Sequence, residues 1–202
     1  MKKLILLLFS LFLTINCSRD NDESSDRFVA VLPQETQKGA NTFGCFIDDF
    51  LFVPRDGNPL VYNQNGVCLN KGISMEGDYY NSDNTLSHRD FEINNYRDNN
   101  YSIGFQLPNF PDMQASEFDF GNSVYEDKIV IIVTFFDNKT NKRYFFRSNN
   151  YSGKLIITRK DNHIFSGTFS GILKEIEGTK EIKLTNGVFD FDLTSVNTHI
   201  YP

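Results

Sequence analysis

The sequence contains no tryptophan, and it has only three cysteines and three histidines among its 202 residues. No two histidines have the spacing of metal ligands, and no pair of cysteines forms a zinc-binding motif. The nucleophile pattern Gly-x-Ser-x-Gly is also missing. We therefore expect no metal, no cofactor and no enzymatic activity.

Basic residues are fewer than acidic ones, with 20 against 26, for a net charge of −6. Nucleic acids select a basic face on the proteins that bind them, and anionic lipids attract basic segments. The composition therefore predicts no nucleic-acid partner and no electrostatic docking on a membrane.

Long apolar runs are absent except at the N-terminus. Residues 4–13 are apolar apart from Ser10, and Lys2 and Lys3 precede them. This run is shorter than the about 20 residues that a membrane-spanning helix needs. It matches the apolar region of a secretory signal peptide, which we place at residues 1–16.

Cys17 follows the apolar run as a candidate lipidation site. Residues 13–17 read LTINC and resemble the lipobox of bacterial lipoproteins, whose cysteine thiolate accepts a diacylglycerol. Each buried methylene of acyl chains such as palmitate adds about 0.8 kcal/mol of membrane affinity. Ile15 and Asn16 replace the usual small residues, so a plain signal peptide with an incidental cysteine is the alternative.

Residues 17–30 are expected to form a disordered tether, because residues 18–27 are polar and acidic and offer nothing to bury. An acidic cluster directly after the lipid-bearing cysteine resembles the surface-export signal of Bacteroidetes lipoproteins. That resemblance implies display on the outer face of the outer membrane. A linker on the periplasmic face is the alternative.

The remaining residues, 31–202, have a length that suits one domain. Cys45 and Cys68 are its cysteines, and an oxidising compartment permits a disulfide between them. Closing that loop would stabilise the domain by roughly 3 kcal/mol. Two separate buried thiols are the alternative, because spacing cannot show that two Cα atoms approach within about 7 Å.

Patterns of β-strands dominate from residue 43 onward, with abundant phenylalanine and no helical periodicity. We expect a hairpin at 42–53 with a two-residue turn at Asp48 and Asp49, and an irregular stretch with a short helical turn at 109–125. Further strands are expected at 60–63, 71–77, 88–95, 101–107, 128–136, 143–147, 154–159, 163–173 and 181–193. About ten strands predict an all-β antiparallel meander, closed as a lipocalin-like barrel or stacked as a β-sandwich.

Three features of these strands carry further expectations. Residues 128–136 are apolar on both faces, which predicts a central strand covered on both sides. Gly167 and Gly171 indicate bending or the close approach of a neighbouring strand. Asp190 and Asp192 alternate with inward phenylalanines and are expected on the wet face of their strand.

Residues 32–45, which read LPQETQKGANTFGC, resemble the opening motif of an uncharacterised Bacteroidetes lipoprotein family, domain of unknown function 6252. Residues 165–170 and 184–190 are similar to its closing motifs, and the resemblance spans roughly residues 30–194. The two-residue turn at Asp48 and Asp49 departs from the polar-plus-glycine turn of that family. The resemblance implies a β-rich lipoprotein, and it supplies no catalytic residue.

The opening motif also has a physical interpretation. Gly39, Asn41 and Gly44 suit tight backbone turns, and Leu32 with Pro33 could fix where the chain joins the barrel. A loop that binds a ligand or partner is the alternative.

Candidate binding residues are carboxylates and tyrosines. Three carboxylate pairs could hold Ca²⁺ or serve a glycosidase, although solvated strand faces explain them equally: Asp48 with Asp49, Glu117 with Asp119, and Asp190 with Asp192. Four tyrosines could support a glycan: Tyr79, Tyr80, Tyr101 and Tyr151.

We thus expect a lipid-anchored, non-enzymatic domain that binds a protein or glycan partner at the cell envelope. A barrel that holds a small apolar ligand among inward phenylalanines is one alternative. A hydrolase of envelope or host polymers is the other.

Replacement of Cys17 by alanine is expected to remove the protein from the membrane fraction, because the acyl chains supply the membrane affinity. Cell fractionation measures the anchoring, and labelling of intact live cells reports whether the wild-type domain lies on the outer surface. A variant that stays membrane-bound would contradict the lipid anchor.

Overall fold

The computed structural model describes residues 28–57, 71–80, 86–97 and 101–202. Cys17, Cys68 and the strand expected at 60–63 lie outside these residues. The described strands are β1 (Thr42–Ile47), β2 (Phe50–Phe52), β3 (Ile73–Tyr80), β4 (Leu86–Asn94), β5 (Tyr101–Pro108), β6 (Glu117–Asp119), β7 (Val130–Asp137), β8 (Lys142–Asp161), β9 (Ile164–Glu175) and β10 (Glu181–Asp192). Short 3₁₀ turns occur at η1 (Phe110–Asp112) and η2 (Val124–Glu126), within or next to the stretch expected to be irregular.

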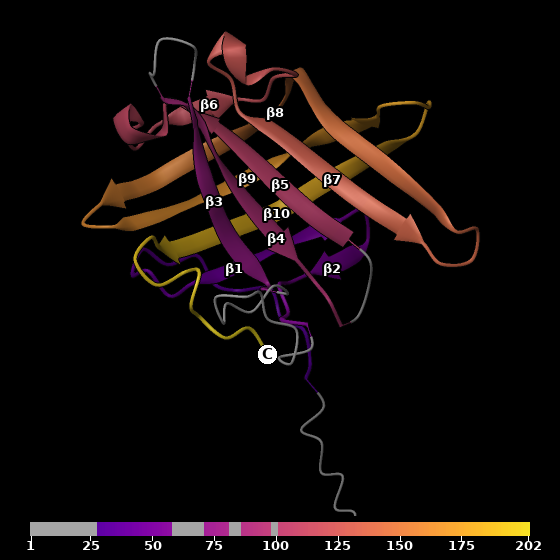
Figure 1. Cartoon of the computed structure of the whole chain (residues 1–202), viewed down its shortest axis with the longest axis horizontal. Coiled ribbons are helices and arrows are strands. Elements are labelled where there is room, and N and C mark those ends of the chain that lie inside the picture. The colour runs from indigo at the N-terminus through magenta and orange to yellow at the C-terminus, as the bar shows by residue number, and fades with distance from the viewer. Residues whose placement is uncertain (1–27, 58–70, 81–85, 98–100) are drawn as a thin grey trace, which may run out of the picture.

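The described strands form one ten-stranded sheet in the order β2-β1-β10-β9-β8-β7-β5-β4-β3, with β6 added beside β8. Every pairing between these strands is antiparallel. Figure 1 shows the sheet curled on itself, with β3, β4, β5 and β7 crossing in front of β1, β9 and β10. The prediction of an all-β, barrel-like meander is therefore confirmed, and the closure is that of a half-barrel.

Strand β8 connects the two sides of the curl. Its first residues pair with β7, while β9 pairs with it along most of its length. The sequence predicted two strands here, but the structure has one strand of 20 residues. A register shift between Ser148 and Gly153, where Tyr151 has a φ of 61°, bends the strand without ending it.

Phenylalanine rings fill the inside of the half-barrel. Phe165 and Phe189 lie 4.8 Å apart between ring centroids, and Phe105 and Phe169 lie 5.0 Å apart. Each such pair adds about 0.5–1.5 kcal/mol beyond the area that it buries. The space enclosed among these rings is about 10 Å³, close to what one water molecule needs. The interior thus has no room for a small apolar ligand at this point.

Glycines on the inner faces make room for the rings and for neighbouring backbone. A Cβ on Gly167 would lie 2.1 Å from the carbonyl oxygen of Ile156 and 2.7 Å from the ring of Phe189. A Cβ on Gly171 would lie 2.6 Å from the ring of Phe120. The close approach expected at these two glycines is therefore present.

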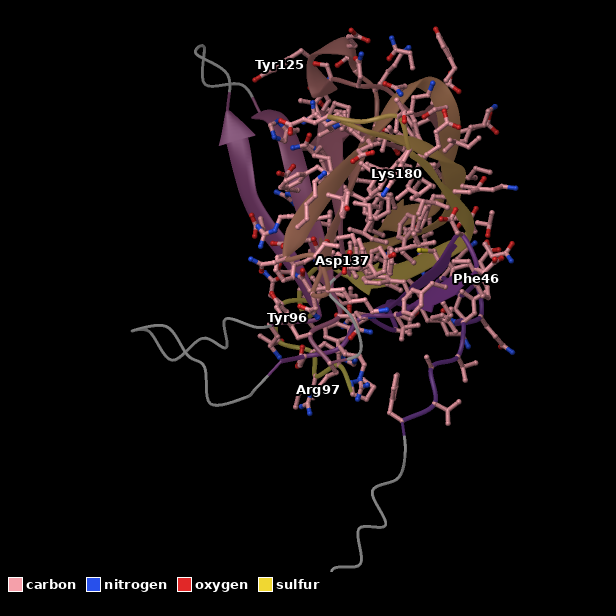
Figure 2. The ribbon with its side chains drawn as sticks, turned by 90° about the vertical axis from the view of Figure 1, so that its right-hand side faces the viewer. Phe46, Tyr96, Arg97, Tyr125, Asp137 and Lys180 are labelled. Atoms are coloured by element: carbon pink, nitrogen blue, oxygen red, sulfur yellow. The ribbon has the colours of Figure 1, made fainter. Side chains whose placement is uncertain are left out.

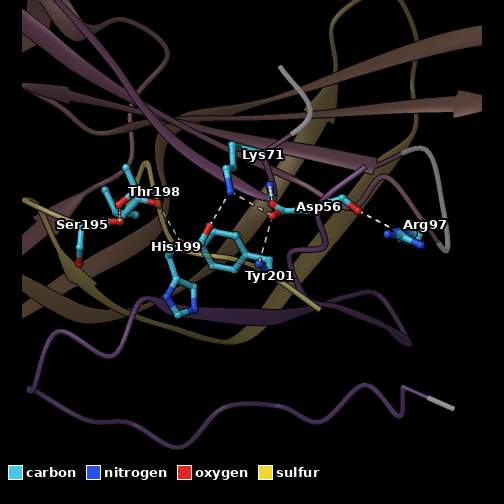
Figure 3. A network of polar contacts seen from close by, with 9 residues as sticks. Asp56, Lys71, Arg97, Ser195, Thr198, His199 and Tyr201 are labelled. Atoms are coloured by element: carbon cyan, nitrogen blue, oxygen red, sulfur yellow. Dashed lines mark hydrogen bonds and ion pairs between the residues drawn. The ribbon is translucent and has the colours of Figure 1, made fainter. Parts of the chain in front are cut away.

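A polar network around Asp56 holds the end of the chain against the open side of the curl (Figure 3). The Asp56 carboxylate accepts hydrogen bonds from the backbone N–H groups of Gly72 (2.6 Å) and Tyr201 (3.3 Å) and from Lys71 Nζ (3.2 Å). Arg97 Nε donates to the Asp56 carbonyl at 2.9 Å. Burial, and then the charge of Asp56, raise the pKa of Tyr201. The C-terminal segment thereby links the chain after β2 to the start of β3.

Gly167→Ala is expected to destabilise the domain by about 1–3 kcal/mol, because its Cβ would overlap a backbone carbonyl that cannot move independently. Gly104→Ala is the matched control, since its nearest atom would lie 3.9 Å away. Urea unfolding measures both variants. Equal stabilities would contradict the packing described for Gly167.

Candidate functional site

A groove runs over the outer face of β4, β5, β7 and β8. It consists of two adjoining hollows of about 430 Å³ and about 180 Å³, which share Glu92, Ser102 and Thr134 in their linings. The larger hollow falls in the range of about 300–1,000 Å³ that small-molecule sites occupy. The groove is therefore the candidate functional site.

The strand register explains why this face is hollowed. Asn94, Ser102, Thr134 and Phe145 are cross-strand neighbours on β4, β5, β7 and β8. Small side chains in the middle of this row lie between larger ones at its ends. In the next row the centre is Gly104, where an added Cβ would have its nearest neighbour 3.9 Å away. Gly104 thus forms an open floor.

Strand β7 differs from its prediction at this point. Val130, Ile131 and Val133 are buried, but Ile132 and Thr134 are only partly buried and line the groove. The strand is central within the sheet, between β5 and β8. The expectation that residues 128–136 are covered on both faces is wrong, because the outer side of the half-barrel has no second layer here.

Aromatic side chains border the larger hollow. Tyr96, in the turn after β4, and Phe145 on β8 are each 44% exposed, and Phe136 on β7 also lines the hollow. Figure 2 places Tyr96 beside Arg97 at one end of the molecule. Arg143 on β8 completes this side. Exposed rings beside polar groups can contact an apolar face of a ligand while its edges hydrogen-bond.

Carboxylates border the smaller hollow: Glu76 from β3, and Asp90 and Glu92 from β4. Burial raises the pKa of Glu76, and a hydrogen bond with Glu92 raises it further. Burial also raises the pKa of Asp90, against the smaller opposite effects of His88 and Gln106. His88 Nε2 lies 3.6 Å from Asp90 Oδ1. The carboxyl groups of Glu76 and Asp90 are therefore protonated more readily at this edge of the groove than they would be in water.

Asp190 does not lie on the wet face of its strand, as the sequence predicted. It is 1% exposed, and it accepts hydrogen bonds from Thr36, from Ser166 Oγ (2.6 Å), and from the backbone N–H groups of Lys38 (3.0 Å) and Gly39 (2.8 Å). The N-terminal arm, residues 28–41, covers it. Asp190 therefore holds this arm and leaves no free carboxylate for a cation or a substrate.

The opening motif agrees with its structural interpretation. Gly39 and Asn41 have φ values of 72° and 53°, in the left-handed region. Gly44 serves a different purpose, because a Cβ there would lie 2.5 Å from Pro33 Cδ. Pro33 thus packs directly on β1 and fixes where the chain joins the sheet.

The other predicted carboxylate pairs have structural partners. Asp48 accepts a hydrogen bond from the backbone N–H of Lys183 at 2.8 Å. Glu117 pairs with Lys154. Asp192 accepts from the backbone N–H of Thr194 at 2.9 Å. In the part of the chain that the structure describes, no group of three or more histidines, cysteines or carboxylates could hold a metal ion.

The predicted tyrosines do not form one platform. Tyr101 stacks between Phe50 and Phe135, with centroid distances of 5.6 Å and 4.6 Å, and it also lines the groove. Tyr151 is 73% exposed on the bend of β8, with Lys128 Nζ 3.8 Å from its ring centroid. The side chains of residues 79 and 80 lie outside the description. Sequence reasoning missed Tyr96 and Phe145, although small residues at alternate positions 102 and 104 were a signal for a hollow.

Cys45 is fully buried and forms no disulfide with any residue that the structure describes, and burial raises the pKa of its thiol. Its proposed partner, Cys68, lies outside the described residues, so their disulfide stays a prediction. No helix in the described ranges has the length and apolarity to cross a membrane.

Comparison with known proteins gives no match, because no family model, curated protein or solved structure is significantly similar to this chain. The resemblance to the uncharacterised lipoprotein family therefore rests on the motifs quoted above. The function has to be inferred from the groove itself.

Asp190→Asn is expected to lower the free energy of unfolding at neutral pH by about 2–4 kcal/mol, because buried donors would lose a charged acceptor. Burial raises the pKa of Asp190, but the hydrogen bonds from Ser166, Thr36 and the arm outweigh this effect and hold it at about 2, below the ordinary 3.8.

That lowered pKa determines the pH dependence. The stabilisation is fully present above the pKa of the unfolded state, and it is lost as the pH falls toward the folded value. Wild type and Asp190→Asn should therefore converge in stability between about pH 4 and pH 2. Urea unfolding across this range measures the effect, with the exposed Asp49→Asn as control. A stability difference that does not depend on pH would contradict the assignment.

Proposed function

We propose that this chain is a lipid-anchored, non-enzymatic binding domain of the outer membrane that takes a glycan in its outer-face groove. One observation carries the proposal: the open floor at Gly104 lies between exposed aromatic side chains on one side and carboxylates on the other. Lipid on Cys17 would hold this groove at the cell envelope.

The groove chemistry matches the chemistry of sugars. Hydroxyl groups of a sugar donate to carboxylates such as Glu92, and amides such as Gln106 can both donate and accept. The C–H faces of a pyranose ring are apolar and suit the exposed rings of Tyr96 and Phe145. The polar lining and the packed interior both favour this site over one inside the half-barrel.

A glycoside hydrolase is the second candidate, because Asp90 and Glu92 lie on the outer face of one strand within a groove. Successive outward residues of a strand are about 7 Å apart, which is within the range that glycosidases use. Hydrolysis requires the two carboxyl groups to flank the scissile bond. Here both project from β4 on the same side of the groove. Binding without cleavage therefore fits better.

Gly104→Leu is expected to weaken glycan binding by tenfold or more without loss of stability, because the side chain would fill open space in the groove. The control is Gly104→Ala, whose methyl group leaves most of that space free. A panel of immobilised neutral, amino and acidic oligosaccharides identifies the ligand of the purified lipidated protein. Titration calorimetry then compares the variants.

Two results would contradict the proposal: no oligosaccharide of the panel binds the wild type, or Gly104→Leu binds as tightly as the wild type. Newly formed reducing ends during the incubation would favour the hydrolase instead. Urea unfolding of both variants shows that any lost binding does not come from lost folding.

A further inference from the structure

Arg143 on β8 is the only cation among the described residues that line the two hollows of the groove. Its side chain is exposed, and no ion pair of the described chain includes it. Its cross-strand neighbour on β7 is the apolar Phe136. Glu175 and Glu177 share a separate hollow of about 100 Å³ with Arg143, and there Glu175 accepts a hydrogen bond from the backbone N–H of Lys180 at 3.3 Å. The guanidinium of Arg143 therefore borders the groove without an ion-pair partner in the described chain.

Aromatic side chains adjoin Arg143 in the larger hollow. Phe145 is two residues further along β8, on the same face of the strand, with its Cα about 7 Å from that of Arg143. Its ring is 44% exposed, and Phe136 lines the same hollow from β7. Thr134 and then Ser102 follow Phe145 across the sheet, and both are small. A sugar ring that lies against Phe145 in this open space has its substituents within reach of Arg143.

We infer that the glycan of this groove contains a hexuronic acid whose carboxylate binds Arg143 and whose ring lies against Phe145, while a neutral neighbouring sugar extends toward Glu92. The inference rests on the proposed function and names its ligand class, a partly acidic oligosaccharide. The planar guanidinium of arginine forms two parallel N–H···O hydrogen bonds with a carboxylate, each about twice as strong as a neutral hydrogen bond. The hydroxymethyl group that a neutral hexose has in place of the carboxylate offers one uncharged oxygen instead.

The carboxylate of Glu92 on β4 explains why only part of the ligand is acidic. Strands β4 and β8 are three strand spacings of about 4.8 Å apart, so Glu92 lies about 14 Å or more from Arg143. This separation exceeds the Debye length of about 8 Å at physiological ionic strength, and Glu92 therefore does not cancel the attraction of Arg143 for an anion. A second carboxylate placed beside Glu92 would be repelled at short range. The groove thus favours a ligand in which acidic and neutral sugars alternate.

The test compares three tetrasaccharides: glucuronic acid alternating with N-acetylglucosamine, the same molecule with its carboxylates reduced to primary alcohols, and glucuronic acid at every position. Each is titrated by calorimetry into the purified lipidated protein in detergent at neutral pH and physiological ionic strength. We expect the alternating tetrasaccharide to bind about fivefold to tenfold more tightly than its reduced form, because a bidentate ion pair replaces one uncharged hydrogen bond. It should also bind more tightly than the fully uronic tetrasaccharide, which places a second carboxylate beside Glu92.

Two substitutions on the same face of β8 test the role of Arg143. Arg143→Gln removes the guanidinium, so this variant should bind the alternating tetrasaccharide no more tightly than the reduced form. It should still bind the reduced form as the wild type does, which shows that the groove is intact. Arg147→Gln is the matched control, because Arg147 is equally exposed on this face but lines neither hollow. The control should retain the full preference for the carboxylate.

The outcomes separate this inference from the proposed function. Equal binding of the alternating tetrasaccharide and its reduced form, or tighter binding of the fully uronic one, overturns the inference and leaves the glycan site standing. Binding of neutral sugars alone from the wider panel has the same meaning. A preference that survives in Arg143→Gln, or that Arg147→Gln abolishes equally, also overturns it, because the carboxylate is then recognised elsewhere or by general charge. Failure of the folded wild type to bind these tetrasaccharides or any sugar of the panel removes the proposed function as well.

Discussion

The packing of phenylalanine rings inside the curled sheet is the constraint on which the rest of the structure depends. Rings from both sides of the curl meet at centroid distances of about 5 Å, and Gly167 admits a neighbouring carbonyl and the ring of Phe189 at once. The space enclosed among the rings is about 10 Å³. Because these rings fill the interior, the larger hollows of the described chain lie on its outer face.

The alternation of apolar and polar residues was enough to predict the antiparallel strands, since a period of two residues depends only on local geometry. It failed where long-range placement decides the environment. The alternation of apolar and polar residues along β10 predicts that Asp190 faces water. The N-terminal arm, which precedes Asp190 by more than 140 residues in the sequence, covers it instead. The apolar residues on both faces of 128–136 predict a strand covered on both sides, but its outer face lines the groove. The groove itself depends on register across β4, β5, β7 and β8, which no single segment encodes.

The outer groove contains a buried polar atom that the described chain leaves without a hydrogen-bond partner. Asp90 Oδ1 is buried without a hydrogen-bond partner among the described residues, and His88 Nε2 lies 3.6 Å from it. Elsewhere the described chain satisfies buried polar groups thoroughly, as at Asp190 and Asp56. An unpaired polar group costs stability, and this one lies in the same hollow as the open floor at Gly104.

The N-terminal arm has a mechanical consequence for a domain held by its N-terminus. A pull on the N-terminal arm reaches the sheet through the contact of Pro33 with Gly44 and the hydrogen bonds around Asp190. These bonds lie before β1, and β1 itself is flanked by β2 and β10. A force applied to the arm therefore acts first on the hydrogen bonds between the arm and Asp190, and only then on the pairing of β1 with its neighbouring strands.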